Sequence, residues 1–188
     1  MMIYNYIDGS LGNSRYSMTY LDDETLLLTV YSNHCIESVD LSVLSQPITY
    51  AGLCGSVEVK HEGHRLHDAR MYRPAGILSL GENLIYFTTF EQNYVYMIND
   101  LTDQVSILSR GIPHAKMLTY DPHHNALLLP VEHGIMRVNI SDGSAVWLSG
   151  STRSGARLNN FHNVGFLSPF DTVVLSDTTI IISDNRNR

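Results

Sequence analysis

Apolar residues along this chain gather in short runs separated by polar corners, and the runs recur at intervals of about 45 residues. The clearest runs are Leu26–Val30, Leu84–Thr89, Ala126–Val131 and Ile180–Ile182. After each of the first three runs, a corner containing Asn or Gly leads into a strand-like segment that ends on Asp or Asn. Since helical spacing is not sustained anywhere, the pattern predicts short β-strands throughout the chain.

The most complete copy of the repeat begins at Gly52, and its clearest part ends at Asn99. The runs Leu26–Val30 and Ile180–Ile182 are nearly all apolar, as expected of strands buried on both faces between stacked blades. A repeat made only of short strands is typical of a β-propeller. We expect the four strands of this copy at Gly76–Leu80, Leu84–Thr89, Val95–Asn99 and Gln104–Ser109. We therefore predict an all-β fold, a single partial β-propeller of four-stranded antiparallel blades, with blades at residues 1–55, 56–111, 112–155 and 156–188.

Two copies depart from this pattern. The third has His114–Met117 in place of the Pro-x-Gly turn of the second copy. The fourth opens at Leu158–Phe166, carries an insertion around Ser168–Asp177 and ends at Asn185–Arg188, where a third strand is due. We therefore expect the last blade to be incomplete. A closed four-bladed ring is the alternative, because an open propeller leaves strand edges unpaired, but the unfinished last blade argues against it.

The second copy carries the pattern A-x-x-x-x-P-x-G-I at residues 69–77, then L-I-Y at 84–86 and an asparagine at Asn93. This pattern resembles the NHL repeat of six-bladed propellers. Residues 33–36 and 51–55 are similar to secreted members of that family. The resemblance covers nearly the whole chain. It implies a ring of six blades, and hence that this sequence is a piece of a longer protein or that the missing blades come from elsewhere.

Composition bears on partners and on the cellular compartment. The chain has 12 Lys+Arg against 19 Asp+Glu, a net charge of −7, and nucleic-acid binding needs the opposite balance. No run of 18 apolar residues is present, so we expect no membrane span. The first residues, Met1–Tyr6, lack the basic start and apolar core of a signal peptide. Either the protein is cytosolic, or its natural start lies upstream of this sequence.

The two cysteines distinguish between these compartments. We expect Cys35 at the head of the third strand of blade one and Cys54 just past the fourth strand. A turn near Leu44–Ser45 places them opposite one another, close enough for a disulfide. Count, spacing and the family resemblance together favour this disulfide and an oxidising compartment; two free thiols in a cytosolic protein are the alternative. The sequon that begins at Asn139 is a candidate glycosylation site compatible with secretion.

The densest polar cluster of the sequence offers His61, His64, His67 and Asp68. Imidazole nitrogens and a carboxylate are suitable ligands for a transition metal. The segment also fits a solvated loop that carries the chain from the rim of one blade to the axis of the next, and we favour that interpretation. We expect no bound metal and no cofactor.

Overlaying the copies places Arg15, Arg73, His114 and His162 at equivalent points, three residues before the first strand of each blade. In a propeller this point lies near the mouth of the central channel. Four such side chains could form a positive funnel that holds an anion or a carboxylate. The interpretation that we favour is that each side chain bonds backbone carbonyls where two blades meet.

The sequence favours a binding or structural module over an enzyme. Amidating lyases and lactonases resemble this architecture and hold zinc or calcium at the channel mouth. The lyase pattern implies histidines immediately before the inner-strand glycine, where this chain has Ala75, Lys116 and Val164. We find no nucleophile motif and no phosphate loop. We therefore expect a non-catalytic extracellular module that contacts other protein chains, or further blades of the same protein, through loops or blade edges. The alternative is a metal-dependent lyase or hydrolase with its site at the central channel.

Overall fold

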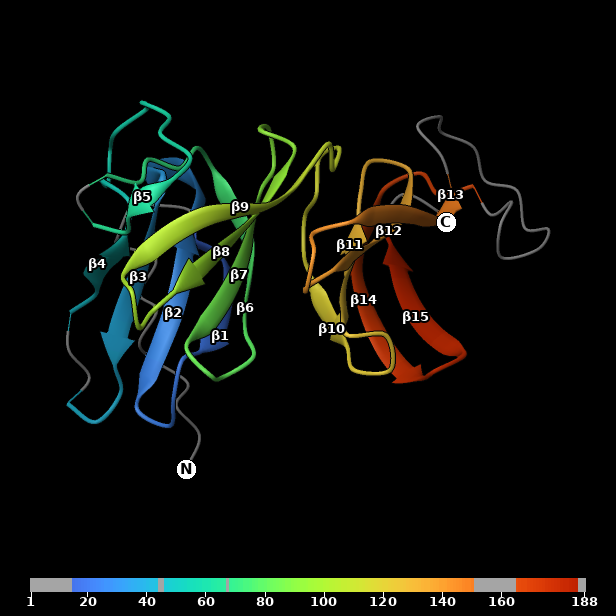
Figure 1. Cartoon of the computed structure of the whole chain (residues 1–188), viewed down its shortest axis with the longest axis horizontal. Coiled ribbons are helices and arrows are strands. Elements are labelled where there is room, and N and C mark those ends of the chain that lie inside the picture. The colour runs from blue at the N-terminus through green and yellow to red at the C-terminus, as the bar shows by residue number, and fades with distance from the viewer. Residues whose placement is uncertain (1–14, 44–45, 67, 151–164, 186–188) are drawn as a thin grey trace.

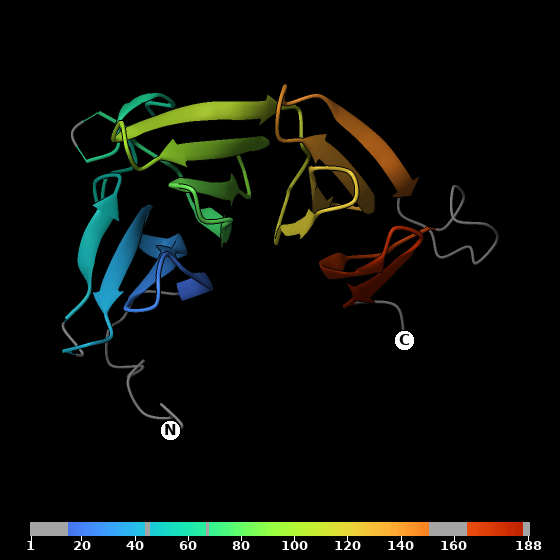
Figure 2. The same ribbon diagram turned by 60° about the horizontal axis from the view of Figure 1, so that its bottom comes forward.

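The computed structural model describes residues 15–43, 46–66, 68–150 and 165–185, and nearly all regular structure within them is β-strand. The strands form four antiparallel sheets, in the orders β1-β2-β3-β4, β5-β9-β8-β7-β6, β10-β11-β12-β13 and β14-β15. The sheets, which we call blades one to four, stand side by side in an open arc with β1, β6, β10 and β14 on its inner side (Figures 1 and 2). The strands are β1 Arg15–Tyr20, β2 Thr25–Val30, β3 Cys35–Asp40, β4 Ile48–Ala51, β5 Gly63–His64, β6 Pro74–Ser79, β7 Leu84–Thr89, β8 Tyr94–Asn99, β9 Gln104–Arg110, β10 Thr119–Asp121, β11 Ala126–Pro130, β12 Gly134–Asn139, β13 Ala145–Gly150, β14 Pro169–Ser176 and β15 Thr179–Asp184.

This arrangement confirms the predicted all-β fold of antiparallel blades. In blade two the predicted second strand matches β7 at both ends. The prediction for β6 is off by two residues at its start and one at its end, and those for β8 and β9 are each off by one residue at one end. Each sheet falls inside the residue range expected for its blade. The short 3-10 helix η1, Tyr31–Asn33, fills the corner between β2 and β3.

The fourth blade corrects the prediction at one strand. Residues 168–177, which we expected to be an insertion, contain the inner strand β14, which pairs with β15 over its length. The ladder between them shifts register near both ends of β14. The exposed positions Val173 and Leu175 are apolar, so the sequence lacks the apolar–polar alternation by which a half-buried strand is detected. The predicted opening at Leu158–Phe166 lies mostly outside the described residues, and only its last two residues, 165–166, fall within them.

Apolar side chains fill the spaces between neighbouring blades. Leu27 and Ile36 of blade one pack in one buried cluster with Phe87 and Tyr96 of blade two. The rings of Phe87 and Tyr96 stack with their centroids 4.8 Å apart. Tyr86, the residue before Phe87 in β7, points to the opposite side and belongs to the cluster shared with blade three. Alternate residues of one strand therefore pack on opposite neighbours, as the period of two requires, and this explains why the run is apolar throughout.

Hydrogen bonds near the axis join the blades in series. Thr29 Oγ1 donates to a backbone carbonyl of β6 at 2.6 Å, and Thr88 Oγ1 donates to the carbonyl of Lys116 at 2.7 Å. The equivalent position in blade three is Pro130, which has no hydroxyl. There the ammonium of Lys116 donates instead to the carbonyl of Pro169 in blade four, at 2.8 Å. A lysine thus replaces the threonine of the repeat at the last junction.

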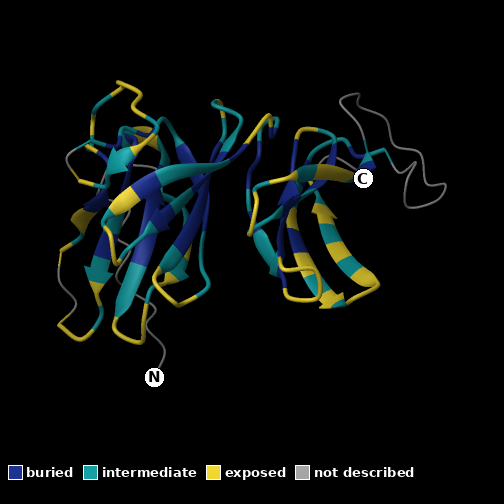
Figure 3. Ribbon diagram, in the orientation of Figure 1, coloured by how far each residue is buried: buried dark blue, intermediate teal, exposed yellow. Residues whose placement is uncertain are grey.

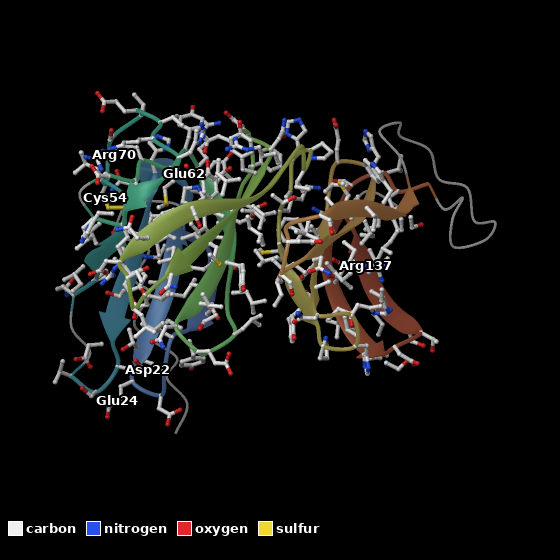
Figure 4. All side chains as sticks on the ribbon, in the orientation of Figure 1. Asp22, Glu24, Cys54, Glu62, Arg70 and Arg137 are labelled. Carbon is white, nitrogen blue, oxygen red and sulfur yellow. A yellow bond between two sulfur atoms is a disulfide. The ribbon has the colours of Figure 1, made fainter. Side chains whose placement is uncertain are left out.

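Cys35 and Cys54 form a disulfide, as predicted, with their Cα atoms 5.0 Å apart. Figure 4 labels Cys54 beside blade one. The strand register differs from the one expected, because Ile36 pairs with Ala51 and the ladder ends there. The disulfide therefore joins the start of β3 to the segment beyond β4, and it fixes the outer strand, which has only one neighbouring strand in its sheet.

The described part of the chain contains no helix with the length and hydropathy needed to cross a bilayer.

Candidate functional site

A cavity of about 420 Å³ lies where the inner strands of all four blades converge. Its wall is mainly apolar and includes Met18, Leu118 and Val173. Among its described lining residues, Asp171 is the single acidic group, and none is a histidine or a cysteine. Thr172 is 3% exposed, and its hydroxyl finds no hydrogen-bond partner among the described residues. The axis therefore offers space and hydroxyl groups, with little charge.

Residues at the corner between the second and third strands of blades one and two bind the backbone at the start of the next blade. His34 and Asn93 occupy the same place after their strands, and both are left-handed, with φ of 61° and 60°. Their side chains accept the backbone N–H of Arg73 at 3.2 Å and of His114 at 3.1 Å. Arg73 and His114 are also left-handed, with φ of 52° and 49°. These two residues are therefore structurally equivalent, at the point where one blade passes to the next.

The hydrogen bond from Arg73 fixes the protonation state of His34. Because Nδ1 accepts that bond, the neutral ring carries its proton on Nε2. The ring also stacks on Tyr72, with centroids 4.7 Å apart. Burial and then the nearby charge of Arg73 lower the pKa of His34. Protonation of Nδ1 turns the acceptor into a donor, so the contact at this corner depends on a neutral ring.

Arg73 lies between two tyrosine rings on the rim. Its guanidinium carbon is 5.3 Å from the ring centroids of both Tyr31 and Tyr72, and the guanidinium forms an ion pair with Glu91. The side chain is 37% exposed, so its charged end meets solvent. A cation is attracted electrostatically by the faces of the aromatic rings beneath it. The arrangement therefore presents a positioned arginine rather than a freely moving one.

The aromatic surface continues from Tyr31 toward the axis. The ring of Tyr16 stacks on Tyr31, with centroids 5.6 Å apart, and meets Phe170 of blade four at 5.9 Å. Burial and then the neighbouring Tyr31 raise the pKa of Tyr16, so its phenol stays neutral. We call Tyr16, Tyr31, Tyr72 and Arg73 the rim cluster. All four are partly exposed.

The structure gives different surroundings to the residues predicted at the channel mouth. Arg73 and His114 are rim residues, whereas Arg15 begins β1 and forms an ion pair with Glu37 at 2.8 Å. Its ladder position corresponds to that of Pro74, one residue beyond Arg73. Nδ1 of His114 is buried and has no hydrogen-bond partner in the described part of the chain. His162 lies outside the described residues.

Of the predicted metal ligands, His61 and Asp68 contact other side chains, and the backbone N–H of His64 donates to Asp68 Oδ2 at 3.3 Å. His61 Nδ1 lies 2.6 Å from a tyrosine hydroxyl of β8, and Asp68 forms an ion pair with Lys60 at 2.8 Å. His64 belongs to β5, which pairs with β9, so part of the expected loop is a strand at the outer edge of blade two. His67 lies outside the described residues. Within those residues, a group of three ligand-type atoms within 4.8 Å occurs around the disulfide, where both sulfurs are already bonded to each other.

Asn139 is the last residue of β12 and is partly exposed. Its Oδ1 accepts the backbone N–H of Ser141 at 2.8 Å, which forms a local turn. The sequon is thus in the β12–β13 turn, and glycosylation there stays a prediction.

The aromatic residues of the rim cluster were not predicted from the sequence. Tyr31 immediately follows β2, and Phe90 immediately follows β7, so both copies place an aromatic residue at the same corner. That coincidence is visible when the copies are overlaid. The contact between Tyr16 and Phe170 had no such signal, because it joins the first and last described blades.

No protein-family model and no curated protein matches this sequence. Solved structures do match. One is an inactive H270A virginiamycin B lyase from Staphylococcus aureus with quinupristin, at 13% identity and a TM-score of 0.60, over 93% of this chain and 50% of that chain. Another is the extracellular domain of a protein described as a hybrid two-component system from Bacteroides thetaiotaomicron, at 15% identity and a TM-score of 0.60, over 90% and 22%. A second such domain from that organism matches at 18% identity and a TM-score of 0.57, over 90% and 21%.

These neighbours are β-propellers, and the likeness establishes the propeller fold of this chain. The chain spans half the length of the lyase structure and about a fifth of the other two chains.

Proposed function

We propose that this chain is a non-catalytic, extracellular binding module of the NHL-like propeller type that contacts a protein partner through the rim cluster. The observation that carries the proposal is Arg73, held between Tyr31 and Tyr72 while its charged end stays exposed. Tyrosine and arginine are the residues most enriched at energetically dominant contact points of protein interfaces. A pre-positioned side chain loses less conformational freedom on binding, which suits the rim cluster to this role.

The disulfide supports the proposed compartment. Disulfides persist in oxidising environments and are rare in reduced ones. The Cys35–Cys54 bridge therefore fits a secreted protein or an extracellular domain, and the sequon at Asn139 is compatible with glycosylation along that route.

The cavity at the axis supports binding ahead of catalysis. A metal-dependent lyase or hydrolase needs several nitrogen or carboxylate ligands in one place. The described lining offers Asp171 alone as a charged group. Of the predicted ligands His61, His64, His67 and Asp68, the three that the structure describes belong to the outer segment of blade two, and each contacts another side chain. Catalysis at the channel is thus the second candidate.

The test is differential capture by the full chain. The purified chain and its Arg73→Ala and Tyr31→Ala variants are immobilised, exposed to the extracellular fraction of the native source, and compared by quantitative mass spectrometry. We expect one protein, or a few, to bind the unmodified chain and to lose roughly 30-fold in affinity with either variant, as dominant interface residues do.

The matched control is Leu101→Ala, in the β8–β9 turn at the opposite end of β8 from the rim, where the side chain is 78% exposed. Its capture should equal that of the unmodified chain. Equal capture by all variants contradicts the proposal. Capture that disappears on chelation and returns with a divalent metal favours the catalytic alternative.

A further inference from the structure

Three candidate metal ligands meet on one side of blade one. The sulfurs of Cys35 and Cys54 and a carboxylate oxygen of Glu37 lie within 4.8 Å of one another. Cys35 and Glu37 are two residues apart in β3, so their side chains lie on the same side of the strand, and Cys54 approaches from the segment beyond β4. We call these three residues the thiol site.

The thiol site is largely sheltered from solvent. Cys35 is 0% exposed, and the Glu37 side chain is 13% exposed. The end of β2 that pairs with the start of β3 is buried as well (Figure 3). Cys54 is partly exposed, which gives a reductant its point of attack. The site therefore combines buried ligands with one accessible sulfur.

Reduction turns the disulfide into two free ligands. A dithiol reductant gives up two electrons and two protons and closes its own disulfide, while the bond between the two protein sulfurs breaks and each sulfur becomes a thiol. The thiols stay close because β3 remains paired with β2 up to Cys35, and the backbone N–H of Gly55 donates to the Asn33 carbonyl at 2.8 Å. A newly made chain has the same two thiols before the bridge forms.

We propose that the reduced thiol site binds one Zn²⁺ through both sulfurs and the Glu37 carboxylate. Thiolate sulfur and carboxylate oxygen are common zinc ligands, and zinc prefers four ligands in a tetrahedron, so a water molecule supplies the fourth. Each thiol releases its proton to solvent as its sulfur binds, because the thiolate is the form that binds a metal. The oxidised chain, whose sulfurs are bonded to each other, binds no zinc at this site.

The neighbours of the thiol site suit a divalent cation. A guanidinium nitrogen of Arg15 donates to Glu37 Oε2 at 2.8 Å and so orients the carboxylate. Thr49 Oγ1 lies 3.3 Å from Cys54 Sγ, within reach to donate to that sulfur. Two thiolates, one carboxylate and one guanidinium leave two negative charges, which one Zn²⁺ neutralises. Neutrality matters here because uncompensated charge is costly where Arg15 and Glu37 are only 12% and 13% exposed.

The experiment measures zinc binding by the full chain in its two redox states. The chain is reduced with a dithiol, the dithiol is removed in the absence of air, and Zn²⁺ alone is titrated in competition with a chelating dye. We expect one zinc per reduced chain, bound roughly 100-fold more tightly, or better, than by the oxidised chain. His61 and His64 are present in both states, so any zinc that they hold cancels in this comparison.

Substitutions identify the ligands. Glu37→Gln removes the carboxylate while keeping the size of the side chain, and should weaken zinc binding by the reduced chain about tenfold or more. Cys54→Ser should lower zinc binding to the level of the oxidised chain. The matched control is Glu58→Gln, because Glu58 is exposed and lies four residues from Cys54. This control should bind zinc as the unmodified chain does.

A measurement without any substitution keeps the result interpretable if Glu37→Gln does not fold. X-ray absorption by the zinc-loaded, unmodified chain should show two sulfur ligands at about 2.3 Å and two oxygen ligands at about 2.0–2.2 Å. Equal zinc binding in both redox states, one zinc shared between two chains, binding that Glu37→Gln leaves unchanged, or fewer than two sulfur ligands each overturn the proposal. The thiol site shares no residue with the rim cluster, so loss of partner capture there leaves this result unaffected.

Discussion

Blades two and four are built from the same repeat but are buried to very different degrees. In blade two, Tyr86 and Phe87 are adjacent, point to opposite sides, and are exposed by 1% and 0%. In blade four, Ile181 at the position of Tyr86 is 55% exposed. The strand Ile180–Ile182 is as apolar as its counterparts. Burial at this position therefore depends on stacking, because the side of blade four that carries Ile181 has no neighbouring blade in the described part of the chain.

The junctions between blades differ in kind as well. Blades one to three are joined by continuous apolar clusters, whereas the contacts between blades three and four include a lysine near the axis that the earlier junctions do not use. Lys116 donates to Ser168 Oγ at 2.9 Å and to the Pro169 carbonyl at 2.8 Å, and Thr119 donates to the Thr172 carbonyl at 2.6 Å. Perturbations should accordingly affect the two regions differently.

The largest difference is expected from truncating the same residue type in each region. Ile85→Ala in blade two removes a fully buried side chain and should lower the free energy of unfolding by about 2–5 kcal/mol. Ile181→Ala in blade four should change it by less than about 0.5 kcal/mol, because the side chain is already exposed. Urea denaturation followed by circular dichroism measures both. Equal losses at the two positions would contradict the comparison.

The second largest loss of stability is expected from removing the disulfide. Replacing Cys35 and Cys54 together by alanine removes a bridge between residues 19 apart in sequence. The expected loss is about 3 kcal/mol, from the greater freedom of the unfolded chain. The urea midpoint of the oxidised protein, of the reduced protein and of the double variant measures it. We expect the last two to agree with each other, and an unchanged midpoint would show that blade one does not need the bridge.

Lys116→Met should loosen blade four while blades one to three stay intact. The variant leaves the Pro169 carbonyl without its charged donor, a loss of about 1–3 kcal/mol at that junction. We expect thermolysin to cleave within residues 169–184 roughly tenfold faster or more. The matched control is Lys60→Met, because the Lys60 side chain is 58% exposed and pairs only at the surface. Faster cleavage throughout the chain would argue that blade four does not open separately.

The smallest effect is the dependence of stability on pH. Burial is the first cause that lowers the pKa of both His34 and His61, followed by Arg73 and Arg110 respectively, from 6.5. The unfolded chain therefore takes up protons that the folded chain does not, and the free energy of unfolding should fall as the pH drops below about 6.5. Urea midpoints between pH 7.5 and 5 measure this slope.

A substitution at His34 tests whether this residue contributes to the pH dependence. His34→Asn keeps an acceptor at the corner, as Asn93 does in blade two, but removes the titrating ring. We expect it to flatten the pH dependence without a large loss of stability at pH 7.5. An unchanged slope would place the titration elsewhere.

The stacked blades could be predicted because the physics that forms them is local and repeated. The run Leu84–Thr89 is apolar on both sides of the strand, and its predicted bounds match those of β7. The disulfide could be proposed because Cys35 and Cys54 flank one hairpin, although the register that joins them was wrong. Both features involve residues that are close together in the sequence, so a sequence pattern can indicate them.

The parts that escaped prediction depend on contacts between distant residues. β14 was missed because its exposed positions Val173 and Leu175 are apolar, so its sequence does not alternate between apolar and polar residues. Lys116 donates to blade four because Pro130 stands where blades one and two have Thr29 and Thr88, and a proline has no hydroxyl to donate. The approach of Tyr16 to Phe170 is set by how far the arc of blades turns, and no single repeat encodes that.

Hydrogen exchange of backbone amides, resolved by strand, tests most directly the central claim that the less buried blade four opens separately from blade two. The account predicts that amides of β7 and β8 exchange only as fast as global unfolding allows, while those of β14 and β15 exchange at least tenfold faster through separate opening of blade four. Uniform protection across β7, β8, β14 and β15 in the isolated chain would contradict it.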